Sequence, residues 1–224
     1  MNNEEVFALT WSAETLFVEA GIENRLPVLH KVDGPWTRLC SQMSWQDALR
    51  ASEQANFAQT VANFEHDILA ELLAFDKDGR VVIADEVCSG AGWLIDPAKF
   101  NEALIPFYAR VLAQVEMPTG FHSDGNMSEV FPQLTEAGFS FVHLASVNYV
   151  DLPAIVHKAQ NNALTPYGGI SSQTLEEGSL SGEVRELLGK LVSNEGLIVC
   201  DDGGMTTQQQ LDAFLFELNA IPLY

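Results

Sequence analysis

Short apolar runs alternate along this chain with longer segments in which apolar residues recur at helical spacing. Apolar and β-branched runs bounded by turn signals are typical of strands, and they occur at 26–32, 81–85, 119–124, 139–146, 163–169 and 196–202. A three-to-four-residue apolar period predicts helices at 44–75, 97–115, 127–137, 150–160, 182–193 and 206–221. A seventh strand is predicted within 4–12, followed by helix-like residues 13–20.

This alternation favours an α/β fold with a parallel sheet covered by helices. The sequence contains no linker rich in Gly, Ser or Pro, no low-complexity tract and no internal repeat, so we predict one domain, 1–224. A complete (β/α)₈ barrel typically needs about 250 residues, and this chain is about two strand–helix units short of that. We therefore predict an incomplete TIM-type barrel of about six or seven strands.

Composition narrows the classes of partner. The formal net charge is −20, which disfavours nucleic acid and anionic membranes as partners. Hydrophobic residues make up 47% of the chain, enough for a sizeable core. The three cysteines are too few for a disulfide framework. Because the sequence has neither a signal-peptide pattern nor a membrane-length apolar run, we expect a soluble cytoplasmic protein. We also expect a small-molecule substrate.

The stretch FHSDGN, residues 121–126, carries the strongest candidate chemistry. His122 and Asp124 are two residues apart at the end of a strand and therefore share one face. Glu86 and Asp202 also follow strands, and the carboxyl ends of barrel strands converge on one mouth. We expect His122 and Asp124 to lie within about 8 Å of Glu86 or Asp202. Such a set of nitrogen and oxygen ligands suits a divalent metal.

Further residues are candidates for substrate binding. Adjacent strand residues point in opposite directions, so only one of Asp85 and Glu86 can face the interior. Regular alternation selects Glu86, whereas a bulge would select Asp85. Asp33 lies in a turn, and Trp36 could pack under the barrel. Asn148 and Tyr149 follow a strand and could donate hydrogen bonds to a substrate, and Gly168 permits close approach of a ligand or a second backbone.

Several motifs in this order resemble those of the uroporphyrinogen decarboxylase superfamily. They are PVLHKVDGPWT (27–37), VVIADEV (81–87), FHSDGNMSEVFPQLTEAGFSFVHLA (121–145), TPYGGISSQTL (165–175) and GLIVCDDGGMT (196–206). The superfamily is a TIM barrel and includes the decarboxylase and the corrinoid- and coenzyme M-linked methyltransferases. The resemblance begins at the family's third barrel strand, so residues 1–25 form an atypical segment in place of the first units.

Departures from the family pattern disfavour uroporphyrinogen decarboxylation. The decarboxylase's basic N-terminal motif and central catalytic aspartate have no counterpart here, and Ser41 and Gly203 replace a tyrosine and a histidine. In the methyltransferase branch a His-x-Cys motif and a further cysteine bind zinc. Here Asp124 stands in the first cysteine position, while the second reads Gly203 and Cys200 lies three residues earlier. Soft thiolate ligands are thus replaced by oxygen.

The resemblance implies a methyltransferase-type enzyme for corrinoid or thiol methyl transfer, with His122, Asp124 and Glu86 as catalytic and metal-binding residues and the corrinoid carried by a partner protein. The alternatives are a decarboxylase completed by another chain, or a non-catalytic barrel that binds a tetrapyrrole-like ligand or a protein. An incomplete barrel leaves unpaired strand edges, so we expect a homodimer or heteromer. In the N-terminal segment we expect four apolar side chains to be buried: Phe7, Leu9, Trp11 and Phe17.

Overall fold

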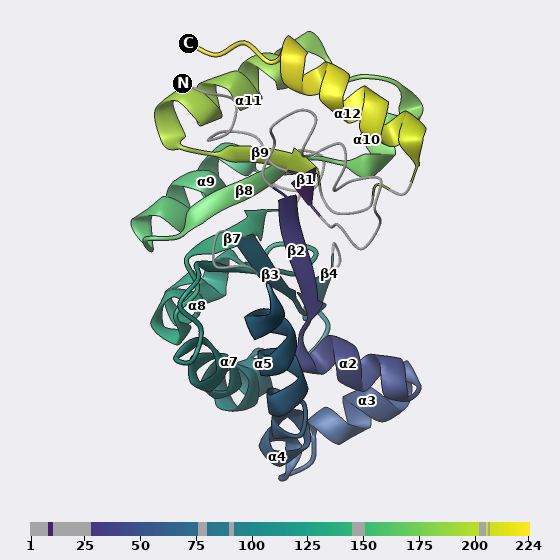
Figure 1. Cartoon of the computed structure of the whole chain (residues 1–224), viewed down its shortest axis with the longest axis vertical. Coiled ribbons are helices and arrows are strands. Elements are labelled where there is room, and N and C mark those ends of the chain that lie inside the picture. The colour runs from purple at the N-terminus through teal and green to yellow at the C-terminus, as the bar shows by residue number, and fades with distance from the viewer. Residues whose placement is uncertain are drawn as a thin grey trace. The chain divides into compact units, whose positions relative to one another are not determined.

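The computed structural model describes residues 9–10, 28–75, 80–89, 92–144, 151–201, 205 and 207–224. It has the predicted α/β fold, in which parallel strands and connecting helices follow the pattern of an incomplete TIM-type barrel (Figure 1). The chain divides into two compact units, one formed by 31–141 and the other by 1–30 with 142–224. The single domain stays a prediction.

All six of the clearly predicted strands are confirmed. They are β2 (Val28–Asp33), β3 (Arg80–Ala84), β6 (Thr119–His122), β7 (Phe141–Leu144), β8 (Thr165–Ile170) and β9 (Ile198–Asp201). The N-terminal strand is present as β1 (Leu9–Thr10), which pairs in parallel with β2. The pairs β3–β6 and β8–β9 are also parallel, as the alternation of strands and helices predicts.

The helical stretch predicted over 44–75 is confirmed, but the unit of residues 31–141 contains three helices there. They are α3 (Trp45–Ser52), α4 (Phe57–Ala62) and α5 (Glu65–Ala74), preceded by α2 (Pro35–Gln42). Turns separate these helices. They are formed by hydrogen bonds from an N–H group to the carbonyl three residues earlier, such as Gln54 N–H to Ala51 O and Asn63 N–H to Thr60 O. The apolar spacing within each helix is nevertheless kept, since Ala48, Phe57, Val61, Ile68 and Leu72 are buried.

The rest of this unit departs from the predicted helices in detail. An antiparallel hairpin pairs β4 (Cys88–Ser89) with β5 (Gly92–Trp93). The predicted helix over 97–115 is divided into α6 (Pro97–Lys99), the π-helical turn η2 (Phe100–Leu104) and α7 (Ile105–Leu112). The predicted helix over 127–137 consists of η3 (Ser128–Val130) and α8 (Phe131–Ala137) and ends at Gly138, a left-handed position that favours glycine.

An aromatic core fixes the orientation of the strands in this unit. Phe121 and Ile83 are fully buried. The Phe121 ring packs against Tyr108 and Phe139, with ring centroids 5.5 and 5.2 Å apart. Tyr108 belongs to α7, so Phe121 faces the helices and its neighbour His122 faces the opposite side of the sheet. The packing of an apolar residue thus sets the direction of the histidine.

The second unit contains α9 (Leu152–Asn161), α10 (Ser172–Glu177), α11 (Gly182–Glu195) and α12 (Gln208–Ala220). Helix α10 is an addition to the predicted elements. Thr207 is the N-cap of α12 and forms a reciprocal capping box with Gln210. Arg185 of α11 forms two hydrogen bonds, of 2.7 and 2.9 Å, with the buried Glu217 of α12 and holds these helices together.

Two sequence-based expectations are not tested by the described residues. Phe7, Trp11 and Phe17 lie outside them, and the side chain of Leu9 is not described, so their burial stays a prediction. Among the helices that the structure describes, none combines the length and the apolar character needed to cross a bilayer.

Candidate functional site

Glu86, His122 and Asp124 converge beyond the carboxyl ends of β3 and β6. These strands pair with Ala84 opposite His122, so Glu86 and Asp124 each follow two residues later on the same face. The Nε2 atom of His122 lies 3.4 Å from Glu86 Oε1 and 3.7 Å from Asp124 Oδ1. One possible ligand atom from each residue lies within 4.8 Å of the others. The predicted proximity to Glu86 is therefore confirmed.

The three side chains differ in exposure. The His122 side chain is 2% exposed, whereas those of Glu86 and Asp124 are 37% and 67% exposed. The histidine thus forms the base of the cluster and the carboxylates form its open side. The backbone N–H of Asp124 donates to Glu86 Oε2 at 3.2 Å, which ties the two carboxylate-bearing segments together.

The electrostatics of the cluster keep Glu86 in its charged form at neutral pH. Burial raises the pKa of Glu86, but the contact with His122, the Asp124 N–H and the charge of Lys31 together lower it more. The net result is a pKa below the usual value for glutamate. One imidazole and two carboxylates are ligands that suit a divalent cation with nitrogen and oxygen preference. Three protein ligands also leave coordination positions for a substrate.

The other residues of FHSDGN serve local structure. The Ser123 Oγ accepts hydrogen bonds from the N–H groups of Val87 and Cys88, at 3.0 and 2.9 Å. Gly125 has a φ of +78°, and a Cβ atom there would lie 2.1 Å from the carbonyl oxygen of Ser89. Only glycine fits both the backbone angle and the close approach. The motif therefore alternates site residues with residues that join this loop to the segment after Glu86.

Asp85 points away from Glu86, as the alternation predicts. Its fully buried carboxylate accepts hydrogen bonds from the N–H groups of Trp36 and Thr37, at 3.2 and 2.6 Å, and from the Tyr108 hydroxyl at 2.5 Å. Two of these donors belong to the first turn of α2, so Asp85 satisfies that helix terminus from a neighbouring strand. Burial raises the pKa of Asp85 to about 6, although its hydrogen bonds oppose the shift.

The GPWT segment is organised around this aspartate. A Cβ atom on Gly34 would lie 2.4 Å from Asp85 Cγ, so the position has no room for a side chain. Trp36 is fully buried and packs edge-on against Trp45 and Phe57, with ring centroids 5.6 and 6.3 Å away. The predicted packing role of Trp36 is therefore confirmed, and a substrate contact by Trp36 stays a prediction.

The remaining predicted substrate residues are placed as follows. Asp33 is exposed and pairs with Lys31, whose Nζ lies 3.2 Å from Asp33 Oδ1. Gly168 belongs to the second unit and has a φ of +135°; a Cβ atom there would lie 2.4 Å from the Leu144 carbonyl oxygen. A close approach of two backbones thus explains this glycine. Asn148, Tyr149 and Asp202 lie outside the described residues, and their roles stay predictions.

The cysteines differ from metal-binding thiolates. Burial, followed by the nearby negative charge, raises the pKa of Cys40 and of Cys88 to about 12. Cys200 is buried, and its Sγ donates to the Asp201 carbonyl at 3.1 Å. Oxygen and imidazole ligands are therefore the available donor set around His122.

Sequence reasoning missed three residues that shape the site: Lys31, Thr37 and Ser123. Lys31 could have been found, because it is two residues before Asp33 on a strand and shares its face. The Thr37 hydroxyl accepts the N–H of Glu86, and the Ser123 hydroxyl accepts the N–H groups of Val87 and Cys88. These partners are 35 to 49 positions away in the sequence. A single sequence carries no signal for such tertiary hydrogen bonds.

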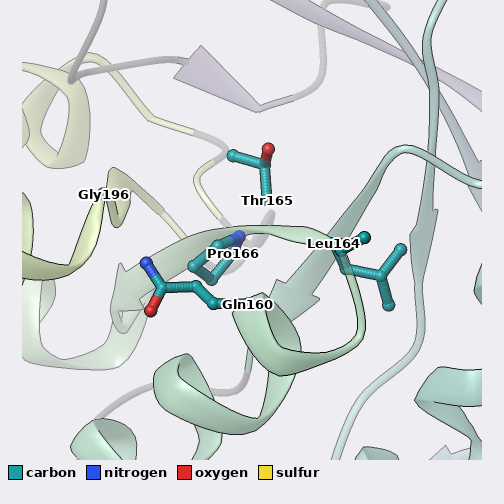
Figure 2. A pocket seen from close by; sticks show the side chains of 6 residues that line it. Gln160, Leu164, Thr165, Pro166 and Gly196 are labelled. Atoms are coloured by element: carbon teal, nitrogen blue, oxygen red, sulfur yellow. The ribbon is translucent and has the colours of Figure 1, made fainter.

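A hollow of about 370 Å³ lies in the second unit, beside the start of β8 (Figure 2). It is lined by Gln160, Ala163, Leu164, Thr165, Pro166 and Gly196. None of these residues carries a titratable side chain, and the face before the strands of a barrel is usually structural. The cluster around His122 is the better candidate for chemistry.

The sequence matches no protein-family model and no curated protein. In structure, the chain is similar to a methyltransferase from Methanosarcina mazei, with a TM-score of 0.66 and 17% sequence identity. The match covers 87% of this chain but 59% of that chain, so this chain spans less than two thirds of the length of the methyltransferase. At this identity the likeness establishes a shared fold: this chain has the α/β fold of a methyltransferase structure.

Proposed function

We propose that this chain is a methyltransferase-type enzyme whose site is a divalent metal held by Glu86, His122 and Asp124. The observation that carries the proposal is the convergence of these side chains beyond β3 and β6, with ligand atoms within 4.8 Å. The structural similarity to a methyltransferase supports the reaction class, as do the motifs that resemble the corrinoid- and coenzyme M-linked branch.

The residues have separate roles in this proposal. His122 offers its Nε2 from a buried position, and Glu86 offers an anionic oxygen whose pKa is already lowered. Asp124 is the most exposed of the three, so substrate approaches the site from its side. A bound divalent ion would supply Lewis-acid chemistry that lowers the pKa of a thiol acceptor.

We further propose that the methyl donor is a corrinoid carried by a partner protein, and that the chain works as a homodimer or heteromer. Acceptance of the methyl group by a thiolate forms a sulfur–carbon bond. The corrinoid held by the partner would supply the methyl group without its bonding electrons: both electrons of the carbon–cobalt bond would stay on the cobalt, which would pass from Co(III) to Co(I). Sedimentation of the purified chain at micromolar concentration tests the homodimer, since a mass of 24.6 kDa would contradict it and leave the heteromer.

A second candidate follows from length. The chain spans 59% of the length of the similar methyltransferase structure, and the alternative proposal is that a second chain completes the site. Such a complex could be a decarboxylase, or the chain could be a non-catalytic barrel that binds a tetrapyrrole-like ligand or a protein. Purified protein alone is expected not to form coproporphyrinogen from uroporphyrinogen, and enzyme-like formation would favour the decarboxylase.

The deciding experiment combines metal binding with methyl transfer. Calorimetric titration with Co²⁺ or Zn²⁺ is expected to give one site per chain. Glu86→Gln should weaken binding at least about tenfold, because loss of even an outer-shell partner typically costs 10–100-fold. Glu136→Gln, on the exposed face of α8, is the matched control and should bind as the wild type does.

The metal-loaded protein is then supplied anaerobically with methylcobalamin and a thiol, and cob(I)alamin formation is followed by absorbance. Rates that depend on protein and fall in Glu86→Gln would support the proposal. Equal metal affinity in wild type and Glu86→Gln would contradict the assigned site. Metal binding without methyl transfer to any thiol would contradict the assigned reaction.

A further inference from the structure

One threonine contacts both members of the Asp85–Glu86 pair. The Thr37 hydroxyl oxygen accepts the backbone N–H of Glu86 at 3.0 Å. The backbone N–H of Thr37 donates to Asp85 Oδ1 at 2.6 Å. Thr37 is half-buried in the first turn of α2, so a helix supplies both contacts.

Glu86 needs such a contact because it is the first residue beyond the strand pairing. Asp85 N–H makes the last strand-like bond, to the His122 carbonyl at 2.9 Å. The chain then turns sharply, since Val87 N–H bonds to the Asp85 carbonyl at 2.7 Å and to Ser123 Oγ at 3.0 Å. Glu86 N–H lies between these bonds, and within the described part of the chain its hydrogen-bond partner is the Thr37 hydroxyl.

We propose that Thr37 is a positioning residue of the candidate metal site: its hydroxyl fixes the backbone of Glu86 so that the Glu86 carboxylate meets His122 and Asp124. This inference rests on the proposed function, because it assigns Glu86 as a ligand. It also gives the GPWT segment a role in the site without any contact between Thr37 and substrate.

The turn explains why the hydroxyl matters. Asp85 and Glu86 are adjacent but serve opposite faces, so a small rotation of the backbone between them moves the Glu86 carboxylate away from His122. Functional sites tolerate displacements of only about 0.5 Å in their ligands. Outer-shell partners of metal ligands typically contribute 10–100-fold to affinity. Loss of the Thr37 hydroxyl should therefore weaken metal binding without removing any ligand.

The test compares Thr37→Val, which keeps the shape but lacks the hydroxyl, with Thr37→Ser, which keeps the hydroxyl. Thr60→Val is the matched control, because the Thr60 hydroxyl bonds within α4 to the Asn56 carbonyl. Each protein is titrated with Co²⁺, and the visible absorption of the bound ion is recorded. Hydrogen exchange of the Glu86 amide is measured on the metal-free proteins, and thermal midpoints establish folding. If Thr37→Val does not fold, Thr37→Ala takes its place.

We expect Thr37→Val to bind Co²⁺ about 10–100-fold more weakly, with an altered spectrum and faster exchange of the Glu86 amide. Thr37→Ser and Thr60→Val should match the wild type in all three. Wild-type affinity and spectrum in Thr37→Val would overturn the inference. If the wild type binds no Co²⁺, the proposed function fails instead. Amide exchange then still decides whether Thr37 fixes Glu86: equal exchange in wild type and Thr37→Val overturns the inference.

Discussion

Replacing Tyr108 with phenylalanine removes a single hydroxyl from the interior. That hydroxyl donates to Asp85 Oδ2, and both side chains are fully buried. The phenyl ring keeps the edge contacts of the tyrosine with Phe121 and Phe139. The substitution therefore deletes one of the hydrogen bonds to this carboxylate and leaves the ring contacts in place. Hydrogen bonds to charged groups contribute about 1.5–3 kcal/mol, and we expect the free energy of unfolding to fall by that amount at pH 8.

The effect should depend on pH in a definite direction. Burial raises the pKa of Asp85 from 3.8 to about 6, so the folded protein holds this proton more tightly than the unfolded chain. The stability that Asp85 contributes is thus fully present below about pH 4 and is lost as the pH rises through 6. A difference of about two pH units corresponds to about 3 kcal/mol. Because the Tyr108 hydrogen bond lowers this pKa, its loss raises the pKa further and extends the decline to higher pH.

Urea unfolding at pH 5 and pH 8 measures both effects. At pH 5 Asp85 is protonated when folded, and the loss should be that of a neutral hydrogen bond, about 0.5–1.5 kcal/mol. Tyr224→Phe is the control for removing a hydroxyl, since Tyr224 is 65% exposed, and it should change stability by less than about 0.5 kcal/mol. A Tyr108→Phe deficit that is equal at the two pH values would refute the reasoning about Asp85.

Three further predictions concern packing and thiol chemistry. Gly34→Ala should destabilise the protein by about 1–3 kcal/mol in urea unfolding, because its Cβ would lie 2.4 Å from the Cγ of the buried Asp85. Gly182→Ala is the control and should not destabilise it, since no atom lies within 4 Å of that Cβ. Phe121→Ala should cost about 3–5 kcal/mol, and an unchanged thermal midpoint would contradict its place in the core. Cys40 and Cys88 should resist alkylation by iodoacetamide at pH 8 until urea is added, since pKa values of about 12 leave about one thiol in 10,000 ionised. Mass spectrometry measures the alkylation, and rapid alkylation of the folded protein would be evidence against this prediction.

The strands were predictable because each is a short apolar run between turn signals, as in residues 81–84 of β3. The convergence of Glu86, His122 and Asp124 was predictable for a related reason. Parallel strands end at the same edge of the sheet, and side chains two residues apart share a face. These two general rules therefore predict that Glu86 and His122, which are 36 positions apart in the sequence, lie close together.

The divided helix over 44–75 and the roles of Thr37 and Ser123 could not be predicted in this way. The apolar spacing that buries Phe57 and Ile68 is the same whether the helix continues or turns between them. The position of the turns depends on local hydrogen bonds near Asn56 and Asn63. The Thr37 hydroxyl contacts an N–H group 49 positions away, and that pairing exists only once α2 and β3 are in place.

The adjacent carboxylates of Asp85 and Glu86 connect stability to the proposed chemistry. Asp85 satisfies the start of α2, and Thr37 of that helix in turn holds the backbone of Glu86. A change that loosens the helix terminus should therefore reach the site without touching a ligand. Tyr108→Phe removes a hydrogen bond to Asp85 and leaves the contact between Thr37 and Glu86 in place. We therefore expect it to lower Co²⁺ affinity by less than Thr37→Val does. Calorimetric titration of both variants would measure this order, and a larger loss in Tyr108→Phe would contradict the path through Thr37.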